Sequence, residues 1–225
     1  MKFRDILLGA ASTLTLGAVA NADDNISERF DWSGFYVGGH AGVARLQARA
    51  NMVNNGAPGV FNLKDTGVTG GIHAGWNAEH DQFIFGLEGD ISYVGLQSGA
   101  TFSRGKSTIS VRSDYDWLAT ARARAGIRTD NMLFFLSGGV ALAHNKLRLI
   151  NNGLATSSSK MLVGWAASAG IEAGFSPMWT GRIEYLYANL GSNSAVLGIG
   201  SAVVNPSIHL VRLGITRKFC MSGTC

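Results

Sequence analysis

The chain has 225 residues, of which 15% are charged and 46% hydrophobic, with 30 glycines, three prolines and a formal net charge of +4. This low charge excludes an intrinsically disordered chain, which needs high charge and low hydrophobicity. Two cysteines are too few for a disulfide-stapled scaffold, and glycine without abundant proline excludes a collagen-like repeat. The length fits one ordinary domain or two small ones.

Residues 1–22 have the layout of a secretory signal peptide. Lys2 and Arg4 precede an uncharged apolar run over residues 6–20, and small residues then form A-x-A patterns that end at Ala20 and Ala22. A transmembrane anchor is the alternative, but this run is shorter than the ~20 residues that a spanning helix needs. We therefore expect export, cleavage after Ala22, and a periplasmic N-terminal segment over residues 23–33.

No later segment has the pattern of a spanning helix. The most apolar stretch, residues 132–143, is short and contains Gly138 and Gly139, and glycine weakens a helix interior. An exported chain of this kind is either a soluble β-rich domain or a membrane β-barrel.

Apolar residues recur at every second position after residue 34. One face of residues 83–93 is apolar while the other carries Glu88 and Asp90, and residues 117–127 likewise oppose an apolar face to Arg122 and Arg124. Period two indicates β-strands. The apolar faces are as long as tilted strands of ~9–11 residues need to cross a membrane.

The alternation predicts eight strands separated by connections of alternating length. Short turns fall at 79–82, 129–131 and 176–178, and longer links rich in Asn, Ser, Gly and Thr fall at 47–66, 97–114, 147–160 and 191–207. Such sorting is typical of outer-membrane barrels, and a β-sandwich has no reason for it. We predict an all-β fold over residues 34–219, an eight-stranded antiparallel up-and-down transmembrane β-barrel. Its strands are expected at 34–46, 67–78, 83–96, 115–128, 132–146, 161–175, 179–190 and 208–219.

Apolar faces turned toward lipid place a balanced set of charges inside the barrel. If Leu96 meets Asp114, then Glu88 lies opposite Arg122, and the turn at 176–178 sets Glu172 opposite Arg182. An unpaired buried charge costs several kcal/mol, and eight strands enclose just enough space for side chains to fill. We therefore predict a plugged interior held by an ion network, and a catalytic acid–base pair is the less favoured interpretation. The network comprises Glu88, Asp90, Arg122, Arg124, Glu172, Arg182, Glu184 and Arg212.

Three further patterns are too weak to predict a site. His40 and His73 point inward without a third ligand nearby, so polar filling is favoured over metal or haem binding. Ser207 and His209 share a face without an acid partner, which a nucleophile–base pair needs. Residues 105–107 (GKS) resemble the end of a phosphate-binding loop but lack its first glycine, since position 100 is alanine. No catalytic, cofactor or metal site is predicted.

The end with the long links is predicted to carry a basic rim. We expect this rim to face the phosphate groups of lipopolysaccharide, because Arg and Lys bind phosphate well; a solvated rim without a ligand is the alternative. Nucleic acid is not an expected partner of an exported protein. The rim comprises Arg45, Arg49, Lys64, Arg104, Lys106, Arg112, Lys146, Arg148 and Lys160, against Asp65 and Asp114.

Three segments carry a family resemblance. Residues 31–39 (DWSGFYVGG), 138–141 (GGVA) and 210–219 (LVRLGITRKF) resemble the opening, fifth and closing strands of the opacity-type and outer-membrane immunogenic porin-like proteins of alphaproteobacteria. The resemblance implies a surface antigen in the cell outer membrane of a Gram-negative bacterium. It also implies that the outer-membrane assembly machinery, after periplasmic chaperones, recognises the closing strand through Val211, Leu213, Ile215 and Phe219.

The chain departs from this family after its closing aromatic residue. Residues 220–225 continue past Phe219 and contain Cys220 and Cys225, which an oxidising periplasm could join as a disulfide or leave for bonding between molecules.

The sequence favours a non-enzymatic barrel with a structural and surface-antigen role. A narrow porin for small solutes is the alternative, and a barrel enzyme that modifies lipid A is a weaker third. A loop ligand such as haem or a host surface has no signature in the sequence.

Overall fold

The computed structural model describes residues 30–54, 57–104, 107–151, 154–191, 193–197 and 200–219, with side chains for 30–48, 64–96, 114–146, 159–191 and 205–219. The predicted signal peptide, most of segment 23–33 and the cysteine-containing residues 220–225 lie outside the described residues. Among those described, no helix is long and apolar enough to cross a membrane.

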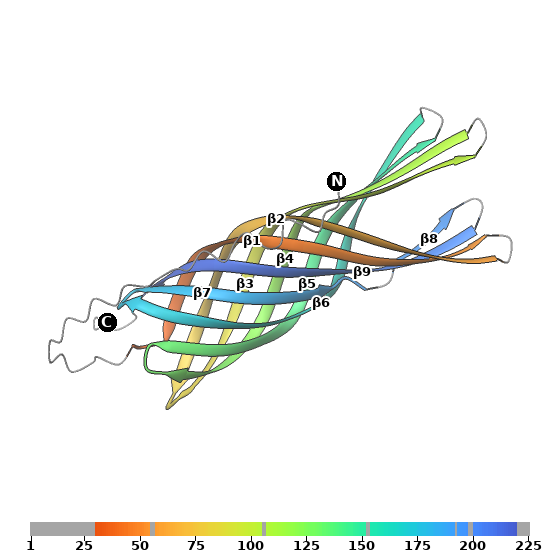
Figure 1. Cartoon of the computed structure of the whole chain (residues 1–225). Helices are drawn as coiled ribbons and strands as arrows, with labels where there is room; N and C mark the ends of the chain where they lie inside the picture. Colours follow the sequence, from red (N-terminus) through yellow and green to blue (C-terminus); the bar gives the residue numbers. More distant parts are fainter. Residues whose placement is uncertain are drawn as a thin grey trace, which may run out of the picture.

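The described residues form one closed antiparallel sheet (Figure 1). From β1 to β7 consecutive strands pair with each other, β7 pairs with β9, and β9 pairs back to β1. The short β8 pairs with β9 beyond the point where β7 ends, so eight strands make up the closed barrel and the predicted fold is confirmed. The strands are β1 Gly34–Asn54, β2 Ala57–His80, β3 Phe83–Arg104, β4 Ser107–Thr129, β5 Met132–Asn151, β6 Leu154–Ser176, β7 Trp179–Asn189, β8 Asn193–Leu197 and β9 Gly200–Phe219.

The longer links predicted at 47–66, 97–114, 147–160 and 191–207 are largely paired strand rather than loop. The β1–β2 ladder continues to Asn54 opposite Ala57, and the β3–β4 ladder continues to Arg104 opposite Ser107. β5 with β6, and β8 with β9, extend in the same way. Backbone hydrogen bonds between paired strands need no apolar face, so the ladder can continue where the lipid-facing pattern stops.

Beyond the barrel, the strands separate into two four-stranded sheets. Pairing between β2 and β3 stops at Thr69–Val94, and pairing between β6 and β7 stops at Trp165–Asn189. The β3–β4–β5–β6 and β8–β9–β1–β2 ladders continue, and Figure 1 shows them diverging as the green and the blue–orange arms. We call this the hairpin end.

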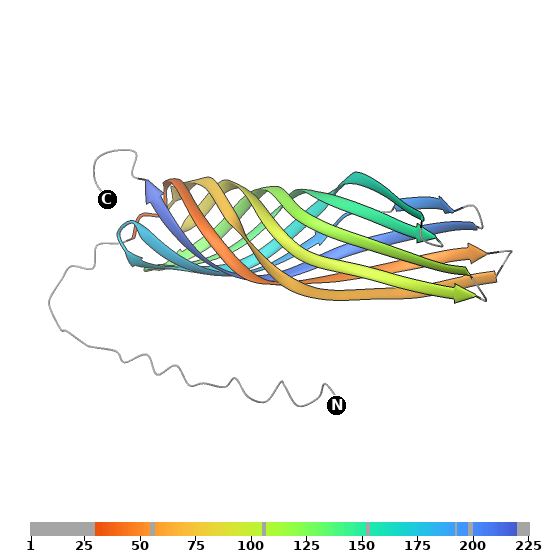
Figure 2. The same cartoon turned by 90° about the horizontal axis from the view of Figure 1, so that it is seen from above.

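The opposite end, which we call the turn end, has three tight connections. β2, β4 and β6 each end two residues before the next strand begins, close to the predicted turns. Asp81 and Asp130 open two of them with positive φ of 57° and 48°, a conformation that Asp tolerates better than most residues. Figure 2 shows the tilted strands winding from this end around the barrel.

The expected pairing of Leu96 with Asp114 is shifted by one residue. Leu96 lies opposite Tyr115, and Asp114 lies opposite Gln97, because the register slips between Tyr93 and Leu96. An extra residue on one strand produces such a β-bulge. Below the bulge the predicted register holds, and Glu88 lies opposite Arg122.

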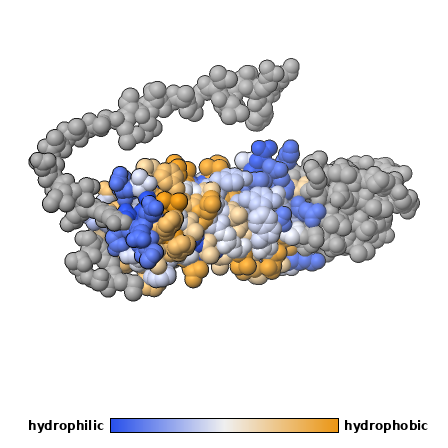
Figure 3. All heavy atoms as spheres, turned by 90° about the horizontal axis from the view of Figure 1, so that it is seen from below, coloured by the Kyte–Doolittle hydropathy of each residue, from blue (hydrophilic) through white to orange (hydrophobic). Residues whose placement is uncertain are grey.

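Outward side chains form an apolar band around the barrel. Leu87, Val163 and Leu213 expose 64%, 64% and 61% of their surface. Figure 3 shows this band between hydrophilic side chains at either end. A continuous exposed apolar surface of this kind is suited to lipid rather than to water.

Candidate functional site

The central layer of the barrel interior is ionic. Eight charged side chains from β3, β4, β6, β7 and β9 lie there, and each is at most 6% exposed. They are the four acids Glu88, Asp90, Glu172 and Glu184 and the four arginines Arg122, Arg124, Arg182 and Arg212. The structure thus places the whole predicted set inside and in mutual contact.

Arg122 joins three of the four acids. Its Nη2 donates to Glu88 Oε1 at 2.7 Å and Asp90 Oδ2 at 3.0 Å, and its Nη1 donates to Glu184 Oε1 at 2.6 Å. Nη1 also donates to the Ser168 hydroxyl at 2.8 Å. One guanidinium therefore ties β4 to β3, β6 and β7.

Cross-strand position does not decide every ion pair. Glu172 lies opposite Arg182, as expected from the turn, but its Oε2 accepts from Arg124 Nη2 at 2.5 Å. Arg182 instead reaches across the interior to Glu88, with Nη1 2.8 Å from Oε2. Because the interior is narrow, a long side chain can meet a partner several strands away as readily as its neighbour.

Arg212 completes the network from β9. Its Nη1 donates to Asp90 Oδ1 at 2.8 Å and its Nη2 to Glu184 Oε2 at 2.9 Å. The remaining acceptor sites are met by hydroxyls, since Tyr36 donates to Glu88 at 2.9 Å and Thr180 donates to Glu172 Oε1 at 2.5 Å.

Each carboxylate oxygen of the four acids thus accepts at least one hydrogen bond from a protein group. The four acids are therefore all paired within the interior.

His40 and His73 lie at the level of the ionic layer, since His73 lies opposite Asp90 and His40 Nε2 lies 3.4 Å from Arg212 Nη1. Their Nδ1 atoms are 3.4 Å apart, and their rings stack with centroids 5.7 Å apart. His40 Nε2 lies 2.9 Å from the Ser92 hydroxyl, and His73 Nε2 lies 2.9 Å from the Thr216 hydroxyl. All four ring nitrogens have protein partners, and the described residues contain no group of three or more potential metal ligands.

Clusters of buried apolar side chains lie on both sides of this polar centre. Toward the hairpin end, the interior is filled by a cluster from β1, β3–β7 and β9 that includes Leu96, Leu118 and Leu210, each 0% exposed. Toward the turn end, Trp32 is 1% exposed and packs with Ile84, Leu133 and Phe135.

The N-terminal segment holds Trp32 in the barrel mouth. The Trp32 backbone N–H donates to Glu79 Oε2 at 3.0 Å, and the Phe30 ring lies 4.6 Å from the Trp32 ring. Partial burial acts to raise the pKa of the preceding Asp31, but hydrogen bonds from Ser33 lower the pKa below its ordinary value. The charged Asp31 carboxylate therefore favours the local conformation in which the Ser33 N–H and hydroxyl donate to it.

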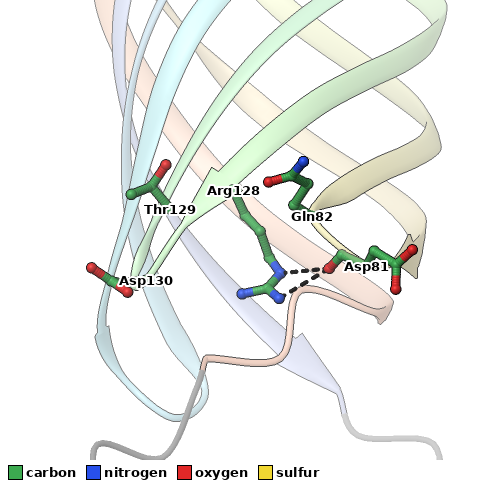
Figure 4. A pocket seen from close by; sticks show the side chains of 5 residues that line it. All are labelled: Asp81, Gln82, Arg128, Thr129 and Asp130. Carbon is green, nitrogen blue, oxygen red and sulfur yellow. Dashed lines mark hydrogen bonds between the residues drawn. The ribbon is translucent and has the colours of Figure 1, made fainter.

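A shallow pocket lies at the turn end, lined by Asp81, Gln82, Arg128, Thr129 and Asp130 (Figure 4). Arg128 Nε and Nη2 donate to the Asp81 carbonyl at 3.0 and 2.9 Å, and Nε lies 2.7 Å from Glu79 Oε1. Since these contacts neutralise the Arg128 cation, the pocket does not present it to an anionic ligand.

The basic rim is less uniform than predicted. Side chains are described for Arg45, Lys64, Lys146 and Lys160, and all four are exposed. Lys146 Nζ lies 2.7 Å from Asp116 Oδ2, an acid that the sequence-based charge balance left out. The rim residues Arg49, Arg104, Lys106, Arg112 and Arg148 have no described side chains.

Ser207 and His209 contact other groups in the structure. Both belong to β9, but the Ser207 hydroxyl donates to the Gln47 carbonyl at 3.2 Å, and His209 Nδ1 lies 2.7 Å from the Tyr185 hydroxyl. Gly105 and Lys106 lie outside the described residues, and the described elements on either side of them are the strands β3 and β4, whereas a phosphate-binding loop is followed by a helix.

On the closing strand, the side chains of Val211, Leu213, Ile215 and Phe219 point outward and are 46–61% exposed. Their recognition by the assembly machinery stays a prediction. Cys220 and Cys225 lie outside the described residues.

Sequence reasoning missed Trp32 and the apolar layer near the hairpin end. Trp32 precedes the first strand, so no alternation marks it as buried. The apolar layer has a signal, since Ala44 and Leu46 in β1, and Val94 and Leu96 in β3, continue the inward positions. Near this end both faces of the strands are therefore partly apolar.

Comparison with known proteins places this architecture in a family. The family model described as "Outer membrane protein beta-barrel domain" matches residues 7–219. The 25 kDa outer-membrane immunogenic protein of Brucella abortus is 30% identical, over 96% of this chain and 98% of that protein. The 22 kDa outer membrane protein of Rhizobium leguminosarum is 30% identical, over 84% of this chain and 78% of that protein.

The fold is also found among solved structures. The outer membrane protein OprG from Pseudomonas aeruginosa has a TM-score of 0.54 at 13% identity, covering 83% of this chain and 97% of that one. The chain belongs to the outer membrane protein β-barrel family and is located in the outer membrane of a Gram-negative bacterium.

Proposed function

We propose that this protein is a sealed barrel that reinforces the outer membrane and presents its hairpin end at the cell surface. In barrels of this kind, short turns face the periplasm and longer connections face outward. The relatives named outer-membrane immunogenic proteins support a surface-antigen role.

The observation that carries this proposal is the filled interior. Along the axis, the apolar layer around Trp32, the polar layer that contains the ionic groups and the histidine pair, and the apolar layer around Leu118 each consist of buried side chains. A hydrated channel would leave some of these polar groups exposed to its lumen.

Contact with lipopolysaccharide is the second part of the proposal. Arg45, Lys64 and Lys160 are exposed near the hairpin end, and cationic side chains bind phosphate through charge-assisted hydrogen bonds.

Planar-bilayer recording and liposome swelling test the sealed interior. The purified barrel is expected to give no stable conductance of porin size and no swelling with small sugars, while a general porin in the same vesicles gives both. Stable conductance by the folded wild type would favour a small-solute pore instead.

The lipid A enzyme is tested separately. The described part of the chain places no acid beside Ser207 and His209, so we expect unchanged lipid A masses when the gene is deleted. A mass shift that the wild-type gene restores would contradict a non-enzymatic role.

A further inference from the structure

One outward face near the hairpin end changes from apolar to polar and basic residues within two to four residues along β1, β2 and β9. On β2, β1 and β9, Val68, Val43 and Val211 lie side by side in register, and they are 69%, 53% and 49% exposed. The next outward row, toward the hairpin end, contains Arg45 and His209, and the row after it contains Lys64 opposite Gln47. The polar rows therefore begin where the lipid-facing band stops.

Aromatic rings complete this face on β7 and β6. Tyr187 lies directly opposite His209, with ring centroids 5.0 Å apart, and Trp165 lies 5.3 Å from Tyr187. The Tyr185 hydroxyl lies 2.7 Å from His209 Nδ1. When Tyr185 donates to Nδ1, Nε2 carries the imidazole proton and remains available as a donor.

The acid next to Lys64 in the sequence lies on the other side of the strand. Asp65 lies opposite the buried Leu46, on the inward side of the ladder. Arg45, His209 and Lys64 thus form an outward cluster of donors at the edge of the apolar band.

A second face of the barrel also combines an aromatic ring, a histidine and a lysine, but an acid lies beside them. Trp117 stacks on His144 with centroids 6.1 Å apart. Here, however, Asp116 Oδ2 lies 2.7 Å from Lys146 Nζ and 3.4 Å from His144 Nδ1. The acid neutralises this face, which makes it an internal control.

We propose that the face formed by Lys64, Arg45, His209, Tyr185, Tyr187 and Trp165 binds a phosphate group of lipopolysaccharide. Arg45 and Lys64 supply charge and donors, His209 Nε2 supplies a third donor, and the rings pack against the sugar and the upper acyl chains. Val43, Val68 and Val211 contact the acyl chains below. This assignment rests on the lipopolysaccharide contact proposed above, and it places that contact on one face of the barrel.

The test uses the folded full-length barrel with defined lipopolysaccharide in detergent micelles. Arg45→Gln/His209→Gln is compared with Lys146→Gln/His144→Gln, and bound lipid per barrel is measured by native mass spectrometry. Arg45→Lys serves as the charge-conserving variant, and heat-modifiable mobility verifies that every variant is folded.

We expect Arg45→Gln/His209→Gln to weaken binding about tenfold or more, the size expected for losing a charge-assisted hydrogen bond. The Lys146→Gln/His144→Gln and Arg45→Lys variants should stay near wild type. Enzymatically dephosphorylated lipid A should bind wild type as weakly as phosphorylated lipid binds the Arg45→Gln/His209→Gln variant.

Equal losses in both double variants, or none in either, would overturn the assignment while leaving a lipopolysaccharide contact elsewhere. If the wild type retains no lipopolysaccharide at all, the contact in the proposed function fails as well. Neither result bears on the sealed interior, which the conductance measurement tests.

Discussion

At the scale of single residues, Arg122 shows why the interior charges act as a unit. Its guanidinium contacts three carboxylates, and its side chain is 0% exposed. Taking such charges out of water costs several kcal/mol per ion, which attraction offsets only when the geometry is good. Removing one member therefore does more than delete one contact, because it leaves the partners buried without compensation.

We predict that Arg122→Gln lowers the free energy of unfolding by about 3 kcal/mol or more, the effect of stranding buried partners. Arg217→Gln is the matched control, because Arg217 is exposed and lies over the Trp179 and Phe219 rings. Its loss should cost less than about 1 kcal/mol. Denaturant titration in vesicles, read by heat-modifiable mobility, measures both, and equal effects would show that the network does not stabilise the barrel.

At the scale of elements, the seam between β1 and β9 depends on close backbone approach. A Cβ built on Gly42 would lie 2.0 Å from the Val211 carbonyl oxygen of β9, whereas a Cβ on Gly39 finds its nearest contact at 3.8 Å. Both glycines belong to β1, but only Gly42 lies where the neighbouring strand leaves no room for a methyl group. Glycine in a strand often marks such an approach.

Gly42→Ala is expected to impair closure of the barrel, and Gly39→Ala is expected to fold like wild type. The physical reason is that the added methyl at position 42 must push β9 away, and that seam closes the sheet. The fraction of protein that shows heat-modifiable mobility after refolding into vesicles measures closure. Similar yields for the two variants would contradict the steric argument.

The segment before β1 is a second element whose role depends on packing. Trp32 fills the turn end of the barrel together with Ile84, Leu133 and Phe135, and Gly174 leaves room for the Phe30 ring, which a Cβ would approach to 2.6 Å. The segment thereby contacts strands that are distant in sequence.

We expect Trp32→Ala to destabilise the barrel by about 3 kcal/mol or more, as large-to-small changes in packed cores do. Trp32→Phe should recover most of this loss because it keeps an aromatic ring in the cluster. Trp179→Ala is the control, since Trp179 is 39% exposed. The unfolding temperature of each variant in detergent, read from the loss of the folded band on electrophoresis, compares the three variants. An unchanged unfolding temperature for Trp32→Ala would show that the segment is not part of the core.

At the scale of the whole molecule, charge is distributed by environment. Outward positions in the band are apolar, the interior holds four acids against four arginines, and exposed cations remain near the hairpin end. Buried pairs are screened little by salt, while exposed charges are screened within ~8 Å at physiological ionic strength.

Raising the salt concentration from about 0.05 M to about 1 M shortens the screening length to roughly 3 Å. This change should leave the unfolding midpoint nearly unchanged, but it should weaken the retention of lipopolysaccharide. The same detergent samples serve for both measurements. A midpoint that falls steeply with salt would indicate that the interior charges are reached by ions, contrary to a sealed interior.

Much of the barrel could be predicted because period-two alternation is a local property. The lipid-facing side of residues 83–93 follows from it, and its interruptions mark the three tight turns. Glu88 does lie opposite Arg122, but only because a bulge offsets the shift in the Leu96–Asp114 pairing from which this was predicted. The extended hairpins could not be predicted this way, because strands beyond the band need no apolar face.

The sequence by itself determined the exported barrel, the face that each strand turns to lipid and the inward position of the eight charges. Only the tertiary structure decided which charges meet, since Glu172 binds Arg124 rather than the cross-strand Arg182. It also placed Trp32 in the mouth and set Arg45 beside His209. Alternation is a local property of each strand's sequence. Contacts across the interior, or between the first and last strands, form only when the barrel closes.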